Sequence, residues 1–266
     1  MGDTGQVTKN AAEVYDELFP PALFNEWAPR VAELAELKPG MHVLDIACGT
    51  GVLSLAAAEM VEPDGFVTGL DLNPGMLSVA RRKAPQIDWR EASAESIPFE
   101  DAAFDAVVSQ FGLMFFEDKA QAIREMVRVL RPAGKLAVAV WDSLENVTGY
   151  AAITRLLTRL FGDSAAESLR APYSLGDVQI LSTLFSDAGV PDFTVSTLEG
   201  KARYPSIRYW MEADIRGWTL SDALDDAQFE SLVSEAETEL ARFVNDHGTV
   251  EFSSPAHIVT ATKRAA

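Results

Sequence analysis

The residues with the clearest chemical potential form a short glycine-rich turn, DIACGTG, from Asp45 to Gly51. The turn follows an apolar run, MHVLDIA, and leads into a helical stretch, GVLSLAAAEM. Small residues at positions 47, 49 and 51 let a ligand approach the backbone, and the first helical turn presents free N–H groups. A second carboxylate, Asp71, lies 26 residues after Asp45 at the end of another apolar run. Because a carboxylate there can accept hydrogen bonds from a ribose diol, the pair predicts a nucleoside-like ligand.

A dinucleotide is one candidate for that ligand, and the glycine spacing tests it. Dinucleotide-binding turns follow G-x-G-x-x-G, with the pyrophosphate at the helix N-terminus. Here the spacing is A-x-G-x-G, and the places where the third glycine would fall hold Val52 and Ser54. The chain also lacks a Tyr-x-x-x-Lys pair. A nicotinamide-dependent oxidoreductase is therefore the disfavoured alternative.

Alternating apolar and amphipathic segments must position this turn. We expect strands near residues 41–47, 65–72, 87–92, 104–111 and 135–141, with helices between them and one N-terminal helix over 22–37. This rhythm is typical of a parallel sheet with helices on both faces. Beyond Trp141 we expect helices at 146–162 and 174–190, a strand at 193–204, mostly helix over 205–245 and a last strand at 257–264. The two late strands are predicted to add an antiparallel edge to the sheet.

Charge and composition exclude several classes of function. The net charge is −18, from 40 acidic and 22 basic residues, and the longest basic run is ARRK. Nucleic-acid binding requires clustered Lys and Arg, so nucleic acid is an unlikely partner. No run approaches the roughly 20 apolar residues of a membrane span, and the N-terminal residues do not form a signal peptide. A single cysteine and three histidines predict no disulfide and no metal site, and they fit a cytoplasmic protein.

Four segments resemble, in order, the motifs of class I S-adenosylmethionine-dependent methyltransferases of the ubiquinone/menaquinone-biosynthesis type (methyltransferase type 11). They are VLDIACGTG, GLDLNPGML, WREASAESIPFEDAAFDAVVSQFGLMFF and EMVRVLRPAGKLAVAVW. The resemblance is close over residues 40–141 and loose elsewhere. Four motifs in order are specific, whereas one alone would be weak. The expected fold is a Rossmann-like, doubly wound, seven-stranded and mostly parallel α/β sheet with an antiparallel edge, N-terminal helices and a helical lid.

The expected organisation is a single methyltransferase domain over residues 1–266. Within it, residues 1–38 form the N-terminal helices, 39–141 the cofactor-binding core, 142–250 the lid with late sheet elements, and 251–266 the last strand.

The resemblance also implies a role for each matching residue. Asp45 orients the turn and contacts the cofactor's amino group, directly or through water. The implied methionine-side residues are Ala47, Cys48, Gly49 and Gly51, together with Gln110 and Phe111 at the transfer site. The implied nucleoside-side residues are Asp71 for the ribose and Leu72, Met76, Ser93 and Ala94 for the adenine. Two positions depart from the family pattern, because Gly is usual at 47 and Asp at 93; Ser93 is a weaker, neutral acceptor.

The acceptor site and the catalytic groups are less marked. Aromatic and apolar residues predicted to contribute to a substrate pocket are Tyr15, Phe19, Trp27, Met114, Trp141, Tyr150, Tyr209, Trp210 and Trp218. Their number favours a small, partly apolar or aromatic metabolite. His42, His247 and His257 are poorly placed in the sequence to act as a general base, and no catalytic residue is identified. Such a site would act by in-line displacement at the activated methyl, giving S-adenosylhomocysteine. A cofactor-binding cyclase or regulator on the same scaffold remains the other alternative.

Overall fold

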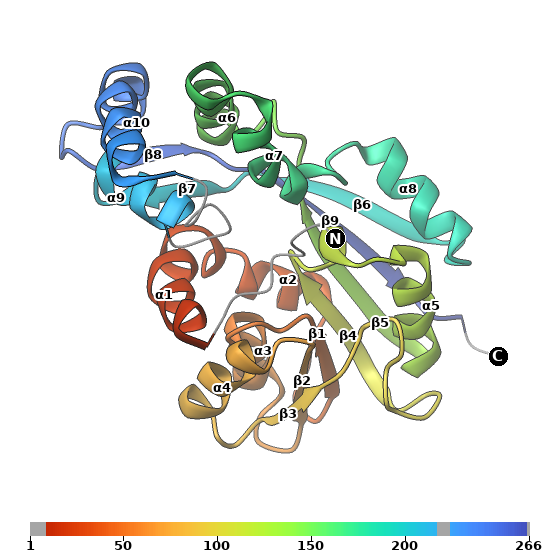
Figure 1. The fold of residues 1–266 in the computed structure, drawn as a ribbon. Helices are drawn as coiled ribbons and strands as arrows, with labels where there is room; N and C mark the ends of the chain where they lie inside the picture. Colours follow the sequence, from red (N-terminus) through yellow and green to blue (C-terminus); the bar gives the residue numbers. More distant parts are fainter. Residues whose placement is uncertain (1–8, 217–223, 265–266) are drawn as a thin grey trace.

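The computed structural model describes residues 9–216 and 224–264 of the chain. Its centre is a seven-stranded sheet in the order β3-β2-β1-β4-β5-β9-β6 (Figure 1). The strands are β1 (His42–Ile46), β2 (Phe66–Asp71), β3 (Asp88–Glu91), β4 (Phe104–Gln110), β5 (Leu130–Trp141), β6 (Phe193–Leu198) and β9 (Ala256–Thr262). Pairs among β1 to β5 are parallel, whereas β9 runs antiparallel to both β5 and β6. The antiparallel strand therefore lies one place inside the edge strand β6.

Helices cover the two faces of this sheet, as the alternating sequence pattern predicts. On one side α2 (Ala28–Leu34) packs against α3 (Val52–Val61), and α4 (Pro74–Lys83) lies beside β3. On the other side α5 (Lys119–Val129) packs against α8 (Val178–Asp187) (Figure 1). Strand β1 is almost entirely buried, which explains its continuous apolar sequence. The ends of β1, β2 and β4 are thus held rigidly at one edge of the layer.

The N-terminal helical segment is broken where the sequence pattern suggests one helix. Helix α1 (Lys9–Phe19) runs directly into a π-helix, η1 (Pro20–Phe24), and α2 begins only at Ala28. Pro20 and Pro29 stand near the starts of η1 and α2, where a missing N–H costs no helical hydrogen bond. The prediction of a single helix over 22–37 is wrong, and the break turns η1 toward the ends of the strands.

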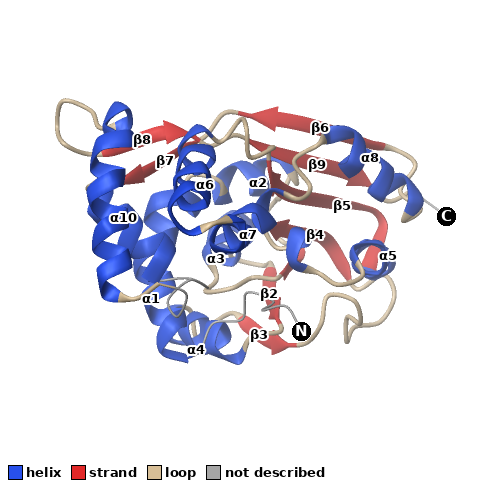
Figure 2. Ribbon diagram, turned by 45° about the horizontal axis from the view of Figure 1, so that its top comes forward, coloured by secondary structure: helices blue, strands red, loops and turns tan. Residues whose placement is uncertain are grey.

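Besides β6, β9 and α8, the chain after Trp141 forms a second group of elements, whose β7 (Lys201–Tyr204), β8 (Val250–Ser253) and α10 (Asp226–Glu239) lie to the left of the main sheet in Figure 2. Its other helices are α6 (Thr148–Phe161), α7 (Asp163–Arg170) and α9 (Ile207–Met211), with short helical turns η3 (Ala171–Tyr173), η4 (Glu212–Arg216) and η5 (Ala241–Phe243). The single strand predicted over 193–204 is in fact two strands, since β6 ends before Gly200 and β7 pairs with β8 in a separate sheet. Gly200 lies between the two strands, and a side chain at this position would collide with the Trp27 ring.

No helix in the described ranges has both the length and the apolar character that a membrane crossing requires.

Candidate functional site

A cavity of about 400 Å³ opens where β1, β2 and β4 end. This volume lies within the range of small-molecule sites. Among its lining residues are eleven of the twelve predicted cofactor residues: Asp45, Ala47, Cys48, Gly49, Asp71, Leu72, Met76, Ser93, Ala94, Gln110 and Phe111. Segments far apart in the sequence thus meet at one edge of the sheet. The twelfth, Gly51, is outside the described lining.

Gly51 has a structural reason to be glycine. Its φ is +90°, and a Cβ built there would lie 2.6 Å from the Trp89 ring. Gly49, with φ +55°, has no such crowding, but its N–H donates to the Asp71 Oδ2 over 2.8 Å. Both glycines adopt the left-handed conformation that L side chains rarely enter. The turn is therefore shaped for a close backbone approach and is tied to the end of β2.

Asp45 is buried and only partly satisfied. Its Oδ2 accepts a hydrogen bond of 2.6 Å from the Ser54 hydroxyl, while its Oδ1 has no partner within the described residues. Burial raises the pKa of Asp45 to about 7, even though the Ser54 hydroxyl favours the charged form. A buried carboxylate oxygen without a partner is costly unless a ligand donates to it.

Asp71 is held by backbone donors on both of its oxygens. Besides the Gly49 bond, its Oδ1 accepts from the Asn73 N–H over 2.8 Å. Burial raises its pKa, and these backbone bonds act in the opposite direction. Because an ionised carboxylate offers about four acceptor positions, Asp71 can keep both bonds and still accept from a ligand.

Two strand ends at the cavity carry left-handed residues other than glycine. Ala47 follows β1 with φ +55°, and Phe111 follows β4 with φ +56°. Such backbone is uncommon for residues with a Cβ and clusters at functional sites. The turn after β4 also brings Gly112 against Ala47.

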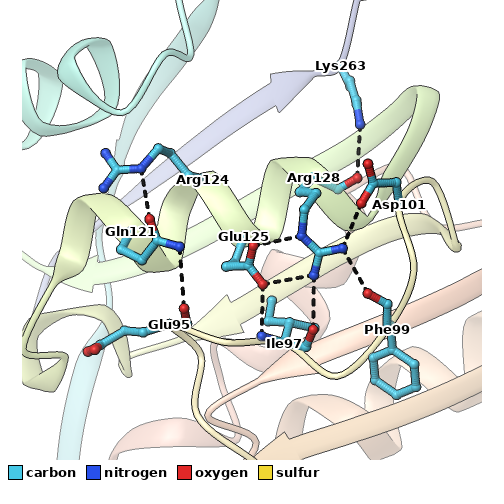
Figure 3. A network of polar contacts seen from close by, with 9 residues as sticks. All are labelled: Glu95, Ile97, Phe99, Asp101, Gln121, Arg124, Glu125, Arg128 and Lys263. Carbon is cyan, nitrogen blue, oxygen red and sulfur yellow. Dashed lines mark hydrogen bonds and ion pairs between the residues drawn. The ribbon is translucent and has the colours of Figure 1, made fainter.

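A network of polar contacts fixes the loop that carries Ser93 and Ala94 (Figure 3). Arg128 on α5 donates to both carboxylate oxygens of Glu125 and to the backbone carbonyls of Ile97 and Phe99. It also pairs with Asp101 at 2.8 Å. A guanidinium in this forked arrangement holds the loop in one conformation.

Glu95 joins the same loop to the segment after the short helical turn η2 (Leu113–Phe115). Its Oε1 accepts from the N–H groups of Glu117 and Asp118 at 2.9 and 3.0 Å. Glu95 and Glu117 both line the cavity. Two walls of the cavity are therefore connected directly.

Three aromatic rings form one side of the cavity, and we call Tyr15, Phe24 and Phe111 the aromatic wall. Ring centroids are 5.8 Å apart for Tyr15 and Phe24 and 5.9 Å apart for Phe24 and Phe111. Trp141 supports the wall from behind, stacked on Phe111 at 3.6 Å with 4° between the planes. Phe24 was not among the predicted site residues, because the broken N-terminal helix is not evident from the sequence.

Three further predicted pocket residues lie behind the aromatic wall rather than in the described lining. Trp27 is fully buried and meets Phe111 edge-on, and Phe19 packs against Tyr15. Trp141 occupies the supporting position described above. Met114 on η2 is buried in the same core and is also outside the described lining.

Tyr150 belongs to a buried group of side chains from α6, β7 and η4 that we call the tyrosine–aspartate cluster (Tyr150, Tyr204 and Asp214). The Tyr150 hydroxyl donates to the Asp214 Oδ1 over 2.9 Å and lies 2.7 Å from the Tyr204 hydroxyl. Burial raises the pKa of Asp214 to about 7. Trp210 stacks on Tyr204, whereas Tyr209 is half-buried on α9. None of these lines the described cavity, and Trp218 is outside the described residues.

The histidines lie away from the cavity. His42 is at the opposite end of β1, edge-on to Phe66, and His247 is in an exposed loop. His257 is buried, with its ring nitrogens against Thr197 Oγ1 and the Gly176 carbonyl. Within the described residues, no group of three or more His, Cys, Asp or Glu side chains could hold a metal ion.

Cys48 is packed rather than exposed. Burial raises the pKa of its thiol well above the ordinary value, so it is unsuited to nucleophilic chemistry. The cavity is completed by lining residues that sequence reasoning did not select: Phe24, Thr50, Val52, Leu53, Leu70, Asn73, Ala92, Gly112, Phe115, Phe116 and Glu117.

The arrangement suits a ligand that combines a ribose with a cationic amine. The partnerless Oδ1 of Asp45 calls for a donor, and the Oε1 of Gln110 is likewise buried with no partner in the described chain. Asp71 offers acceptor positions for a diol. The two carboxylates match S-adenosylmethionine, whose ammonium and ribose hydroxyls are donors.

Comparison with known proteins identifies the family. A model of a methyltransferase domain matches residues 44–138. A demethylmenaquinone methyltransferase of Listeria welshimeri is 34% identical over 180 residues, covering 62% of this chain and 76% of that protein. Another, from Lysinibacillus sphaericus, is 30% identical over 214 residues, covering 74% of this chain and 91% of that protein.

Solved structures share the fold at lower identity. The YcgJ protein of Bacillus subtilis has a TM-score of 0.61 and 19% identity, covering 91% of this chain and 99% of that one. Phosphoethanolamine N-methyltransferase 2 of Haemonchus contortus, in complex with phosphomonomethylethanolamine and S-adenosylhomocysteine, has a TM-score of 0.62 and 19% identity, covering 97% of this chain and 58% of that one. Neither the oxidoreductase nor the non-methylating alternative is favoured. This chain belongs to the S-adenosylmethionine-dependent class I methyltransferases of the quinone-biosynthesis-like group.

Proposed function

We propose that this methyltransferase acts on a small, partly apolar or aromatic metabolite by in-line displacement. The observation that carries the proposal is the aromatic wall, which stands beside the partnerless Gln110 Oε1 in the same cavity. An aromatic surface favours a planar or apolar acceptor, and a single polar group fixes its orientation.

We propose that the polar residues of the cavity hold the cofactor next to the aromatic wall. Asp45 accepts from its ammonium through Oδ1, and Asp71 accepts from its ribose hydroxyls. The turn backbone at Ala47, Cys48, Gly49 and Gly51 borders the methionine part. Leu72, Met76, Ser93 and Ala94 surround the adenine. Gln110 and Phe111 border the transfer site. The lining position of most of these residues supports the assignment.

When bound, the cofactor supplies a methyl group already activated by a sulfonium. The protein then has to align the acceptor and exclude water, and such positioning is worth on the order of 7–11 kcal/mol in well-aligned cases. The aromatic wall excludes water, and the rigid strand ends fix the alignment. No histidine lines the described cavity, so we propose that catalysis relies on positioning rather than on a histidine base.

We further propose that the chain works as one domain, with residues 39–141 as the cofactor core and 142–250 as the lid. Packing of β7 against η1, which carries Phe24, supports a lid that reaches the cavity wall. We place the protein in the cytoplasm, a location that its single cysteine suits.

The test is formation of S-adenosylhomocysteine from S-adenosylmethionine with a panel of acceptors. The panel holds small phenols, catechols and a short-chain demethylmenaquinone analogue. We expect turnover with at least one aromatic member, and we expect Phe24→Ala to lower kcat/KM for that member tenfold or more. The matched control is Phe66→Ala, because Phe66 is 64% exposed at the other end of β2. Turnover confined to non-aromatic, fully polar acceptors would contradict the proposal.

A further inference from the structure

We infer that the cavity discriminates by charge and takes a methyl acceptor that carries no negative group and donates a hydrogen bond. This inference rests on the proposed function and narrows its substrate class. Four carboxylates line the cavity: Asp45, Asp71, Glu95 and Glu117. No Lys, Arg or His of the described residues lines it.

The segments outside the described residues cannot supply the missing cation by a side chain. Residues 1–8 read MGDTGQVT, residues 217–223 read GWTLSDA, and residues 265–266 are both Ala. They contain no Lys, Arg or His, and their charged residues are Asp3 and Asp222. These segments therefore add no positive side-chain charge to the cavity, and the structure does not describe the side chain of Lys9 on α1.

Three basic residues in segments next to the lining bond to neighbouring groups and are not themselves lining residues. Lys119, two residues after Glu117, donates its Nζ to the Phe116 carbonyl over 2.8 Å. Arg81 on α4 donates to the Trp89 carbonyl over 3.2 Å. Lys83 pairs with Asp16 at 2.6 Å. An anionic acceptor would therefore find no side-chain counter-ion in the described cavity.

The carboxylates are not fully neutralised by the cofactor. S-adenosylmethionine carries one net positive charge, from its sulfonium, ammonium and carboxylate. Asp45 and Asp71 serve its ammonium and ribose in the proposed arrangement, so Glu95 and Glu117 remain. Glu95 is anchored by two backbone N–H groups, which hold its carboxylate at the cavity wall. Glu95 is half-buried, so water screens its repulsion of an anion only in part, whereas the exposed Glu117 adds a weaker, screened repulsion.

Hydrogen-bond capacity points to the same class of acceptor. The Gln110 Nε2 donates to the Phe24 carbonyl over 3.2 Å, which leaves its Oε1 as an acceptor without a partner in the described chain. A hydroxyl or amine at the aromatic wall would complete this bond, whereas a carboxylate or phosphate would repel it. Neutral phenols and aromatic amines meet both requirements, and a cationic amine would be tolerated.

Three para-substituted phenols of similar size test the inference, since they differ in charge. They are 4-ethylphenol (neutral), tyramine (cationic) and 3-(4-hydroxyphenyl)propionate (anionic). Binding to the full chain saturated with S-adenosylhomocysteine is measured by saturation-transfer NMR and calorimetry, alongside turnover with S-adenosylmethionine. We expect the anionic phenol to bind at least tenfold more weakly than 4-ethylphenol. Equal or tighter binding of the anionic phenol, or no binding by any of the three, would overturn the inference.

A charge reversal sharpens the test. Glu117→Lys should improve binding of the anionic phenol relative to 4-ethylphenol at least threefold. Glu59→Lys is the matched control, because Glu59 is exposed near the far end of α3 and the substitution changes the net charge equally. The control should leave the ratio unchanged. An equal response of the two variants would mean that overall charge, not the cavity, sets the preference.

The same titrations separate this inference from the proposed function. Failure of the protein to bind S-adenosylhomocysteine would contradict the proposed function itself. Normal cofactor binding with turnover of the anionic phenol would leave methyl transfer intact and remove only the charge preference.

Discussion

The Cβ of Ala47 occupies the space that a side chain at position 112 would need. A Cβ built on Gly112 would lie 2.5 Å from the Cβ of Ala47, closer than real Cβ contacts. The two residues follow adjacent strands, β1 and β4, and Ala47 itself holds a φ of +55°. Alanine at 47 is thus compatible with this turn only because position 112 is glycine.

This pairing predicts a strong coupling between two substitutions. Gly112→Ala alone should lower the free energy of unfolding by about 1–3 kcal/mol through overcrowding. Ala47→Gly should be neutral or slightly stabilising, since glycine accepts positive φ without strain. In the double variant the main clash is absent, so urea unfolding should show most of the Gly112→Ala loss recovered. Strictly additive effects would show that the contact is not the cause.

Asp71 should be needed for both cofactor binding and the local fold. Asp71→Ala removes the acceptor of the Gly49 and Asn73 N–H groups, so it should cost about 1–3 kcal/mol of stability as well as binding. Asp71→Asn keeps one acceptor oxygen and should weaken binding of S-adenosylhomocysteine tenfold or more with a smaller stability loss. Calorimetry and thermal melts measure the two effects, with the exposed Asp64→Asn as control. Unchanged affinity in both Asp71 variants would refute the ribose assignment.

Asp45 should make cofactor binding depend on pH. Its pKa is raised to about 7, and only the ionised form can pair with an ammonium. Affinity for S-adenosylhomocysteine should therefore rise as pH increases from 5 through 7, with its midpoint near 7, and level off about one pH unit above that. Asp45→Asn should bind weakly and without this dependence.

Ser54→Ala provides the matched control for Asp45. Because the Ser54 hydroxyl lowers the Asp45 pKa, its removal should move the midpoint to higher pH. A pH-independent affinity in the unmodified protein would contradict the proposed role.

Arg128 should stabilise the loop that carries Ser93 and Ala94. Arg128→Lys replaces a planar fork with a point charge, so the contacts to Glu125, Ile97 and Phe99 cannot all be kept. We expect Arg128→Lys to lower the free energy of unfolding by about 1–3 kcal/mol and to weaken cofactor binding. Arg124→Lys on the same helix, with exposed partners, should change stability by less than about 0.5 kcal/mol. Equal effects of the two variants in urea unfolding would argue against this role.

Ionisation of Asp214 should lower the stability of the folded protein as pH rises. Its folded pKa of about 7 lies above the ordinary value of 3.8, so the folded state binds the extra proton between these values. Stability from this group is present below pH 4 and is lost as pH rises through 7. The free energy of unfolding should be measured from pH 4 to 8. Over this range the value for Asp214→Asn should increase relative to that for the unmodified protein, by up to about 4 kcal/mol. A constant difference across this range would contradict the raised pKa.

Much of the core was predictable from sequence because its evidence is local. Apolar strands alternate with amphipathic helices, and the segments that line the cavity follow directly after strands. The seven-stranded fold is confirmed, and Asp45, Asp71 and Gln110 meet at one cavity.

The remaining features depend on contacts between distant residues. An apolar sequence does not distinguish a ring facing a cavity, such as Phe24, from the ring behind it, such as Trp27. The sequence marks Ser54 only as a position without glycine, yet its hydroxyl donates a hydrogen bond to Asp45. Where 193–204 splits into two strands, Gly200 packs against Trp27, which is far away in the chain.

Strand β9 has a consequence for synthesis on the ribosome. It lies between β5 and β6, so both of its neighbours are made before it. Until it emerges, β5 presents an open edge of backbone donors and acceptors, and β6 has no partner in the sheet. Nascent chains of this protein are thus vulnerable to intermolecular strand pairing from the synthesis of β5 until that of β9. Shielding of the β5 edge by a chaperone should therefore raise the yield of folded protein more than slower synthesis does.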